Sequence, residues 1–463
     1  MRPREMSDLD LSGVVKTTLK ILQEHTICDN CLGRQFAWLG TGISNKDRGH
    51  SIKLTLTMIA DEQFKVGNKG QSSKIINLLA ENGMFEPAKL VASQNSIEYD
   101  IQDACHLCSL DNESIFDKIQ MISDRMKGMS DDYEFSTFLV GSVPSSVLVE
   151  RQDELSARCS ILYAETLKSH LNREIGSNLQ RILRKEVDFE KPDIVFVYLM
   201  EQDEIRLQVN PIFIYGRYQK LVRGIPQSRW DCKKCKGRGC DDCKGTGRKY
   251  PDSISEYIGI PAQLIADGSK FKLHAAGRED VDVLMLGNGR PFVVEISEPR
   301  VRSPDLHQLA HEINEQANDK IKVHNLQTAD RLTLQKLKEK ASSNVKEYRA
   351  LITVEQSVTN EILEQAETFF RGTDIEQRTP TRVSHRRSDL VRKKRIYEIH
   401  LKKQDENLLE GVFKVQGGTY IKELISGDDG RTIPSITEKL GTKCICKELN
   451  VIAIYSNDAN EHE

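Results

Sequence analysis

Four Cys-x-x-Cys pairs restrict what this chain can fold into more than any other feature of its sequence. They use eight of the eleven cysteines: Cys28 and Cys31, Cys105 and Cys108, Cys232 and Cys235, and Cys240 and Cys243. The N-terminus lacks the apolar stretch of a signal peptide, so we expect a reducing, cytoplasmic environment in which disulfides are rare. Thiols at this spacing then favour metal or redox chemistry.

The first two pairs are predicted to form one structural zinc site. Each pair can wrap one edge of a tetrahedral ion, and four thiolates leave no open position for water. Because 73 residues separate Cys31 from Cys105, such a site would tie together a whole domain. Two alternatives remain open: a pair acts as an isolated redox motif, or the thiols are simply small buried side chains.

The other two pairs belong to a tandem Cys-x-x-Cys-x-Gly-x-Gly repeat at residues 232–247, which resembles the zinc module of DnaJ-type chaperones. Its glycines permit turns that let backbone amides face the thiolates, so zinc is predicted here too. Chaperone activity is not predicted, because the sequence has no J-type His-Pro-Asp helix. The lysines of the repeat and Arg238 could contact phosphate, but solvated charges are commoner.

Length and charge predict a multidomain protein that is not basic overall. A chain of 463 residues exceeds what one hydrophobic core normally covers. The formal net charge is −3, so nucleic-acid binding would require local clusters of basic residues. No run approaches the ~18 apolar residues of a membrane span, and we expect no membrane partner.

The N-terminal half shows helical periodicity followed by a strand pair. An amphipathic stretch at residues 162–183 precedes an apolar strand at 193–200, which a short acidic turn joins to a strand at 205–209. An aromatic and basic segment follows at 210–226. This succession resembles a THUMP-type RNA-binding domain.

The C-terminal half is predicted to be an α+β domain with a mixed, largely antiparallel sheet, because many strands alternate with few helices. Strands at 281–286 and 291–296 flank Gly287-Asn288-Gly289, and Asn-Gly is a strong hairpin signal. Further strands are predicted at residues 348–354, 396–401, 411–415 and 449–455.

Two short motifs in this half point to chemistry. Residues 277–280, Gly-Arg-Glu-Asp, form a predicted tight turn that enters a strand, so Asp280 would stand at the sheet rim, open to a substrate. Residues 418–424 begin with glycine and become helical, which suits them to closing a cleft. In this order, the two motifs resemble the active-site pieces of pseudouridine synthases.

More specifically, the chain resembles the archaeal and eukaryotic tRNA pseudouridine synthases of the Pus-ten family. Besides the N-terminal cysteines, the matching segments are residues 213–218, 224–227, 277–283, 287–292, 378–387 and 418–424. The resemblance implies a tRNA substrate, isomerisation of uridines 54 and 55 in the T loop, and no organic cofactor. We see no sign of an obligate protein partner.

The family resemblance also implies roles for individual residues. The reaction breaks the glycosidic bond of uridine and rejoins the turned base through C5, which requires an ionised carboxylate, here Asp280. Such enzymes extrude the target nucleotide, and Arg278 would point toward the vacated stack and pair with phosphate. Tyr348 would stack on the base, and Leu449 would pack beneath it. The pocket would be shaped by Tyr420, Ile421 and Lys422. Ordinary turn or core packing is the alternative.

A basic segment between two catalytic-domain strands is the candidate RNA-gripping arm. Its predicted RNA-binding residues are Arg378, Arg382, Arg386, Arg387, Arg392 and Lys393. The segment has a single acid, Asp389, and Pro380 stiffens its start. A solvated loop or helix face is the alternative.

These patterns divide the chain into five expected segments. They are a zinc-binding segment at 1–125, a THUMP-like domain at 126–230, a cysteine-rich zinc module or linker at 231–250, a pseudouridine synthase domain at 251–456 and a disordered tail at 457–463. Two other functions remain open. Asp282 and Glu295, on paired strands of the expected hairpin, could imitate the magnesium site of a nuclease. Alternatively, the chain is a non-catalytic, zinc-containing tRNA-binding protein.

Overall fold

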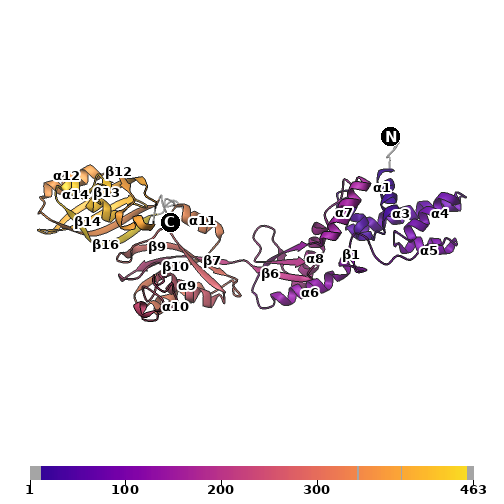
Figure 1. Cartoon of the computed structure of the whole chain (residues 1–463), viewed down its shortest axis with the longest axis horizontal. Helices are drawn as coiled ribbons and strands as arrows, with labels where there is room; N and C mark the ends of the chain where they lie inside the picture. The colour runs from indigo at the N-terminus through magenta and orange to yellow at the C-terminus, as the bar shows by residue number, and fades with distance from the viewer. Residues whose placement is uncertain (1–11, 341–343, 387, 456–463) are drawn as a thin grey trace, which may run out of the picture. The chain divides into compact units, whose positions relative to one another are not determined.

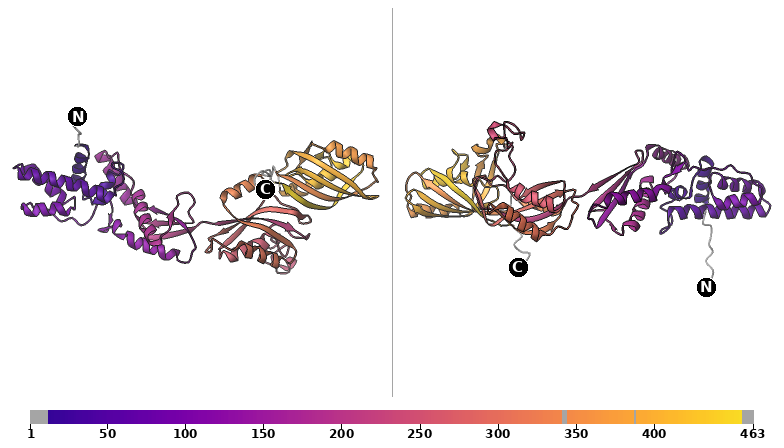
Figure 2. Two further views of the ribbon diagram at one scale, coloured as in Figure 1. Left: turned by 180° about the vertical axis from the view of Figure 1, so that it is seen from behind. Right: turned by 90° about the horizontal axis from the view of Figure 1, so that it is seen from below.

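The computed structural model describes residues 12–340, 344–386 and 388–455, so the expected tail at 457–463 lies outside the described residues. The chain forms two compact units, divided between Asn210 and Pro211 (Figure 1). Each unit contains α-helices and a β-sheet, as Figure 2 shows from two further directions. No helix in the described part of the chain is long and apolar enough to cross a membrane.

The first unit begins with a helical layer. Its helices are α1 (Ser12–Glu24), α2 (Asp29–Gln35), α3 (Asn45–Lys65), α4 (Lys69–Ala80) and α5 (Glu86–Gln94). Two glycines allow α2 and α3 to touch backbone to backbone: a Cβ on Gly33 would lie 1.8 Å from the Asn45 carbonyl oxygen, and one on Gly49 would lie 2.0 Å from that of Asp29. This close contact fixes α2, which carries Cys31, against the longest helix of the layer.

A four-stranded sheet completes the first unit. After the short hairpin β1 (Ser109–Leu110) and β2 (Glu113–Ser114), the chain forms η1 (Ile115–Lys118), α6 (Ile119–Ser130), β3 (Thr137–Val143), α7 (Ser146–Cys159), α8 (Leu167–Leu183), β4 (Glu186–Val187), β5 (Ile194–Leu199) and β6 (Glu204–Val209). The strand order is β4-β3-β5-β6. The predicted hairpin is confirmed, because β5 and β6 pair antiparallel. Buried side chains alternate along β3 and β5 and join the helices in one core.

The second unit is built on a ten-stranded sheet of order β10-β7-β9-β16-β11-β14-β13-β12-β15, with β8 paired to β9. The strands are β7 (Ile212–Lys220), β8 (Lys270–Ala275), β9 (Leu284–Ser297), β10 (Ile321–Ala329), β11 (Val345–Val354), β12 (Thr373–Arg378), β13 (Val391–Asp405), β14 (Leu408–Gln416), β15 (Thr432–Ile433) and β16 (Cys444–Tyr455). Only β9 and β16 pair in parallel among these strands. The predicted α+β class with a mixed, largely antiparallel sheet is confirmed.

Helices pack on both halves of this sheet. They are α9 (Ile254–Ile265), α10 (Leu306–Ala317), α11 (Arg331–Lys340), α12 (Asn360–Phe370), α13 (Ile421–Ser426) and α14 (Ile436–Leu440), with short turns η2 (Asp241–Cys243) and η3 (Thr381–Arg386). Figure 1 shows α9 and α10 beside β10 and β7, and α12 and α14 beside β13. The apolar faces of α9, α10, α12, α13 and α14 form one continuous core with the sheet, and α11 packs in a smaller cluster with Phe213, Ala276 and Val293.

Two sequence expectations differ from the structure. The segment 210–226 was expected in the THUMP-like domain, but β7 pairs with β9 and β10 and so belongs to the second unit. The expected hairpin at Gly287-Asn288-Gly289 is absent, because β9 continues through it as one strand. Both glycines have positive φ, and the Asn288 side chain donates to the Ile454 carbonyl at 2.9 Å. The turn chemistry therefore produces a bend toward β16 rather than a reversal.

Candidate active site

A pocket of about 160 Å³ lies in the second unit where the turn at residues 277–280 approaches β11, β16 and α13. Eight of the residues singled out from the sequence line it: Arg278, Asp280, Tyr348, Arg382, Tyr420, Ile421, Lys422 and Leu449. They come from distant segments of the chain: Arg278 and Leu449 are 171 positions apart. The structure thus places both motifs and both predicted packing residues around one cavity.

Asp280 stands among basic side chains. Its Oδ2 lies 2.7 Å from Arg382 Nη1 and 3.8 Å from Lys422 Nζ. Lys422 Nζ is closer to Asp282 Oδ2, at 2.7 Å. Burial alone would raise the pKa of Asp282, but the hydrogen bond and charge of Lys422, together with the charge of Arg382, lower it below its usual value. The negative charge of Asp280 is therefore compensated mainly by one guanidinium.

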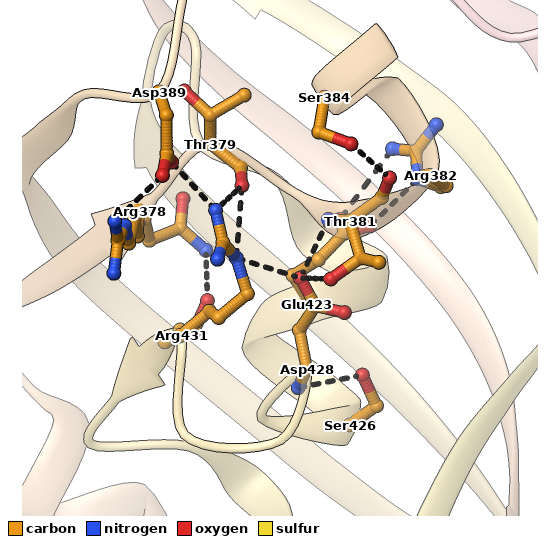
Figure 3. A network of polar contacts seen from close by, with 12 residues as sticks. Arg378, Thr379, Thr381, Arg382, Ser384, Asp389, Glu423, Ser426, Asp428 and Arg431 are labelled. Carbon is orange, nitrogen blue, oxygen red and sulfur yellow. Dashed lines mark hydrogen bonds and ion pairs between the residues drawn. The ribbon is translucent and has the colours of Figure 1, made fainter.

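Arg382, which the sequence singled out as an RNA-binding residue, lines the same pocket. Arg382 and Glu423 form an ion pair (Figure 3), in which Arg382 Nε is 2.6 Å from Glu423 Oε1. The Glu423 side chain is only 6% exposed. Burial alone would lower the pKa of Arg382, but its hydrogen bond to Glu423 and the charge of Asp280 raise it above the usual value. One guanidinium thus joins α13 to the Asp280 turn.

A buried ionic network supports the turn at residues 277–280 on the side that faces the protein interior. Glu279 points inward and accepts hydrogen bonds from the Tyr218 hydroxyl at 2.9 and 3.0 Å. Arg290 Nε lies 2.7 Å from Glu279 Oε2, and its Nη1 donates to the Ala276 carbonyl at 2.8 Å. Both charged side chains are at most 2% exposed. The sequence reasoning missed this pair, although an arginine within an otherwise apolar strand was a signal that it needed a buried partner.

Lys220 fixes the backbone of the same turn. This fully buried lysine donates from Nζ to the carbonyls of Asp280 at 3.2 Å and Val281 at 2.8 Å. Burial lowers the pKa of Lys220 to about 8. The lysine anchors the main chain directly beneath the carboxylate and was also missed from sequence.

Tyr348 and Leu449 form the apolar side of the pocket. In the pairing of β11 with β16, Leu449 is opposite Ala350 and Val451 is opposite Tyr348. Burial raises the pKa of Tyr348 to about 12, so its phenol is protonated at neutral pH. A flat ring beside an aliphatic floor suits a pyrimidine base.

The remaining basic residues of the candidate arm differ in their partners. Arg378 Nη2 lies 2.7 Å from Asp389 Oδ2, and Arg431 joins the same carboxylate (Figure 3). Arg392 instead donates to Thr379 Oγ1 at 3.1 Å, and Lys393 Nζ is 3.8 Å from Glu376. Arg387 and the side chain of Arg386 lie outside the described residues.

The eight paired cysteines form two compact tetrads, one in each unit. In the N-terminal tetrad, Cys28 Sγ is 3.7 Å from Cys108 Sγ. In the second, Cys232 Sγ lies 3.8 Å from Cys240 Sγ. A tetrahedron with zinc–sulfur bonds of about 2.3 Å has edges of about 3.8 Å, so these separations fit a zinc ion.

Arg34 provides an independent test of the N-terminal tetrad. Its side chain is fully buried, and Nη2 lies 3.7 Å from Cys31 Sγ. Its Nε and Nη1 have no hydrogen-bond partner among the described residues. An unpaired buried charge is costly, and a divalent ion with four thiolates carries the net negative charge that would balance it.

The geometry does not support the nuclease alternative. Asp282 precedes β9 and Glu295 lies near its other end, because the expected hairpin does not exist. Glu295 Oε2 is 2.9 Å from His274 Nε2. Across the described residues, groups of His, Cys, Asp and Glu close enough to hold a metal occur only at the cysteine tetrads.

Comparisons with known proteins identify the family of both halves of the chain. Residues 213–455 match the family model described as "Pus10, C-terminal", and residues 122–198 match "Pus10 THUMP domain, archaeal". The tRNA pseudouridine synthase Pus10 of Methanothrix thermoacetophila is 38% identical over 96% of this chain and 95% of that protein. The tRNA pseudouridine synthase Pus10 of Methanocaldococcus jannaschii is 39% identical over 96% and 95%.

Among solved structures, a Cbf5-Nop10-Gar1 complex is similar at 19% identity, covering 44% of this chain and 52% of that chain with a TM-score of 0.27. The family models identify a THUMP domain followed by a Pus10 C-terminal domain. This chain belongs to the Pus10 family.

Proposed function

We propose that this chain is a tRNA pseudouridine synthase with Asp280 as its catalytic carboxylate. The observation that carries the proposal is the arrangement around Asp280: one pocket joins it to Arg382, Tyr348 and Leu449. The names of the Pus10 relatives support the reaction. The proposed targets are uridines 54 and 55 of the T loop, modified by a single chain in the cytoplasm.

Within this proposal, each group has a task. Asp280 acts on the sugar or base of the extruded uridine, as nucleophile or as base. Arg382 holds the carboxylate in place and compensates its charge until substrate arrives. Tyr348 stacks on the base, and Leu449 packs beneath it. The isomerisation involves no oxidation or reduction, and the proposed roles use no organic cofactor.

Zinc is proposed as a structural ion in both tetrads. Four cysteines fill its coordination, so the ions would stabilise structure without taking part in isomerisation. Cys28, Cys31, Cys105 and Cys108 would hold one ion, and Cys232, Cys235, Cys240 and Cys243 the other.

The test is Asp280→Asn, which keeps the shape of the side chain and removes its ionisable group. We expect loss of pseudouridine formation on T-loop tRNA with tRNA affinity nearly unchanged. Glu295→Gln is the control: it belongs to the nuclease alternative and lies away from the pocket, so isomerisation should persist. Activity of the Asp280 variant within about tenfold of wild type, a difference of about 1.4 kcal/mol, would contradict the assignment.

A further inference from the structure

The second cysteine tetrad is joined to the active-site pocket by the residue that precedes it. We call residues 231–249 the cysteine module. Its two ends form a narrow antiparallel stem, in which Asp231 pairs with Arg248 and the Lys249 amide donates to the Trp230 carbonyl at 2.9 Å. Trp230 itself lines the pocket. The stem therefore ends at the wall of the site.

Trp230 is the centre of a small cluster of rings and cations. Its ring centroid is 5.5 Å from that of Tyr250 in an edge-to-face arrangement. Lys249 Nζ lies 5.1 Å from the centroid, and Arg278 Cζ lies 5.5 Å from it. The half-buried indole thus contacts the guanidinium that stands two residues before Asp280.

Arg278 keeps its charge available in this arrangement. Its side chain is exposed, and no carboxylate pairs with it within the part of the chain that the structure describes. A guanidinium on an aromatic face still presents its N–H groups in the plane, where they can donate to a phosphate. Contact with Trp230 restricts where that phosphate would bind.

The cysteine module has no hydrophobic core that could hold this stem in place. Between residues 231 and 249 the only buried residues are Cys235 and Gly247, and the module contains no apolar side chain other than its cysteines. Backbone amides of Gly239 and Gly247 each donate to a cysteine sulfur at 3.2 Å. Metal coordination is therefore the interaction able to give the module a fixed shape.

The second strand of the stem is attached to the catalytic domain through Arg248. Arg248 Nη2 lies 2.9 Å from Glu256 Oε1 on α9, and Arg248 Nη1 donates to the Pro251 carbonyl at 2.9 Å. The cysteine module is thus attached to the catalytic domain by the Arg248–Glu256 ion pair on one side and continues into Trp230 on the other. A metal that fixes the shape of the module would therefore also fix the position of Trp230.

We propose that Trp230 is a positioning residue, held by the metal-bound cysteine module, that orients Arg278 toward a tRNA phosphate next to the target nucleotide. The inference rests on the proposed function, because it assigns the module to the binding of that substrate. It makes the second metal site part of RNA recognition and not only of stability.

The experiment uses the fact that the chain has two tryptophans, Trp38 in the first unit and Trp230. In a Trp38→Phe background, which changes an exposed side chain, all tryptophan emission reports on Trp230. We expect Cys240→Ser to shift this emission to longer wavelength and to increase its quenching by acrylamide, while the folded catalytic domain persists. A Cys446→Ser variant, in the same unit but outside the tetrad, should leave the emission unchanged.

The second arm measures tRNA binding. Trp230→Ala and Arg278→Ala are each expected to raise the tRNA Kd about threefold to tenfold, the range for one cation–π contact, with kcat changed less. The double variant should have a tRNA Kd no higher than that of the weaker-binding single variant, because the two residues act as one unit. Trp230→Phe should restore most of the affinity, which separates a lost ring from a misfolded protein.

Unchanged Trp230 emission in Cys240→Ser would overturn the link to the metal. If the increases in Kd caused by the two single substitutions multiplied in the double variant, the link between Trp230 and Arg278 would be overturned. If the wild-type protein bound tRNA but formed no pseudouridine, the proposed function would fail, and the fluorescence and Kd measurements would still decide this inference.

Discussion

The charged side chains around Asp280 form two groups, one on the pocket side of the turn and one on its inner side. On the pocket side, Asp280 faces Arg382, which is also bound to the buried Glu423. On the inner side, Glu279 is bound to Arg290. Each carboxylate of the turn thus has its own guanidinium, and substrate binding can perturb the outer pair while the inner pair holds the turn in place.

Lys346 is a buried cation at the edge of the inner pair. It is 5% exposed, and burial together with the charge of Arg290 lowers its pKa to about 7, against the opposing effect of Glu279. Below pH 7 Lys346 is charged in both the folded and the unfolded protein, so the full free-energy cost of burying its charge is present. Between pH 7 and its usual value near 10.5 the unfolded chain binds the extra proton, so stability rises with pH.

Lys346→Met removes this buried charge, so we expect the variant to be more stable than wild type by about 1–4 kcal/mol near pH 6. The difference should shrink as pH rises toward 10. Denaturant unfolding at pH 6, 8 and 9.5 measures it, with the exposed Lys402→Met as control. A constant difference across this range would show that the lysine is not titrating in the folded protein.

The site residues that sequence reasoning found are those with local signatures. Asp280 and Lys422 belong to short motifs, and the family resemblance supplied Tyr348 and Leu449. Arg382 was recognised as basic but not as a partner of Asp280, 102 positions away, because ion pairing depends on which strands become neighbours. The buried Glu279–Arg290 pair was missed as well, because the sequence motif did not show that the Glu279 side chain turns inward.

At the level of elements, the segment from β12 to β13 contains two kinds of cation. Arg378 and Arg395 are bound to Asp389 and Asp374. Arg392 has only neutral hydrogen-bond partners among the described residues, and Lys393 is 77% exposed with a carboxylate no nearer than 3.8 Å. Among the cations of this segment that the structure describes, Arg392 and Lys393 are therefore the best able to contact phosphate.

Replacing both Arg392 and Lys393 by Ala should weaken tRNA binding and reduce the slope of log affinity against log salt by about 1–2, because fewer counterions are released. Lys402→Ala with Lys403→Ala is the matched control, since it removes two positive charges from the other end of the same strand. Binding measured across a salt series distinguishes the two. Equal slopes in both double variants would identify the segment as ordinary surface.

Element prediction succeeded where residues interact with near neighbours and failed where partners are distant. The β5–β6 hairpin was predicted because its strands are joined by a short acidic turn. β7 was placed in the wrong unit, because its partner β10 lies about a hundred residues further on. The turn signal at Gly287–Gly289 was expected to give a hairpin. Because Asn288 instead hydrogen-bonds with Ile454, these residues form a bend within β9.

At the scale of the whole molecule, each unit carries one cysteine tetrad in a different setting. The N-terminal tetrad is largely buried and joins the start of α2 to the loop before β1, across most of the helical layer. The second is confined to the cysteine module, whose residues are mostly exposed. Loss of metal should therefore unfold much of the first unit but only a small part of the second.

Calorimetry of the full chain tests this difference, because two compact units are expected to give two unfolding transitions. Cys31→Ser should lower the transition of the first unit by more than about 10 °C, since a structural ion contributes directly to folding, and bound zinc should fall from two equivalents to one. Cys159→Ser is the matched control: this thiol is buried in the same core but belongs to no tetrad, so its loss should lower that transition only slightly. Cys240→Ser should remove one equivalent of zinc and leave the first transition in place. Equal effects of Cys31→Ser and Cys159→Ser would mean that the four N-terminal thiols are ordinary core side chains.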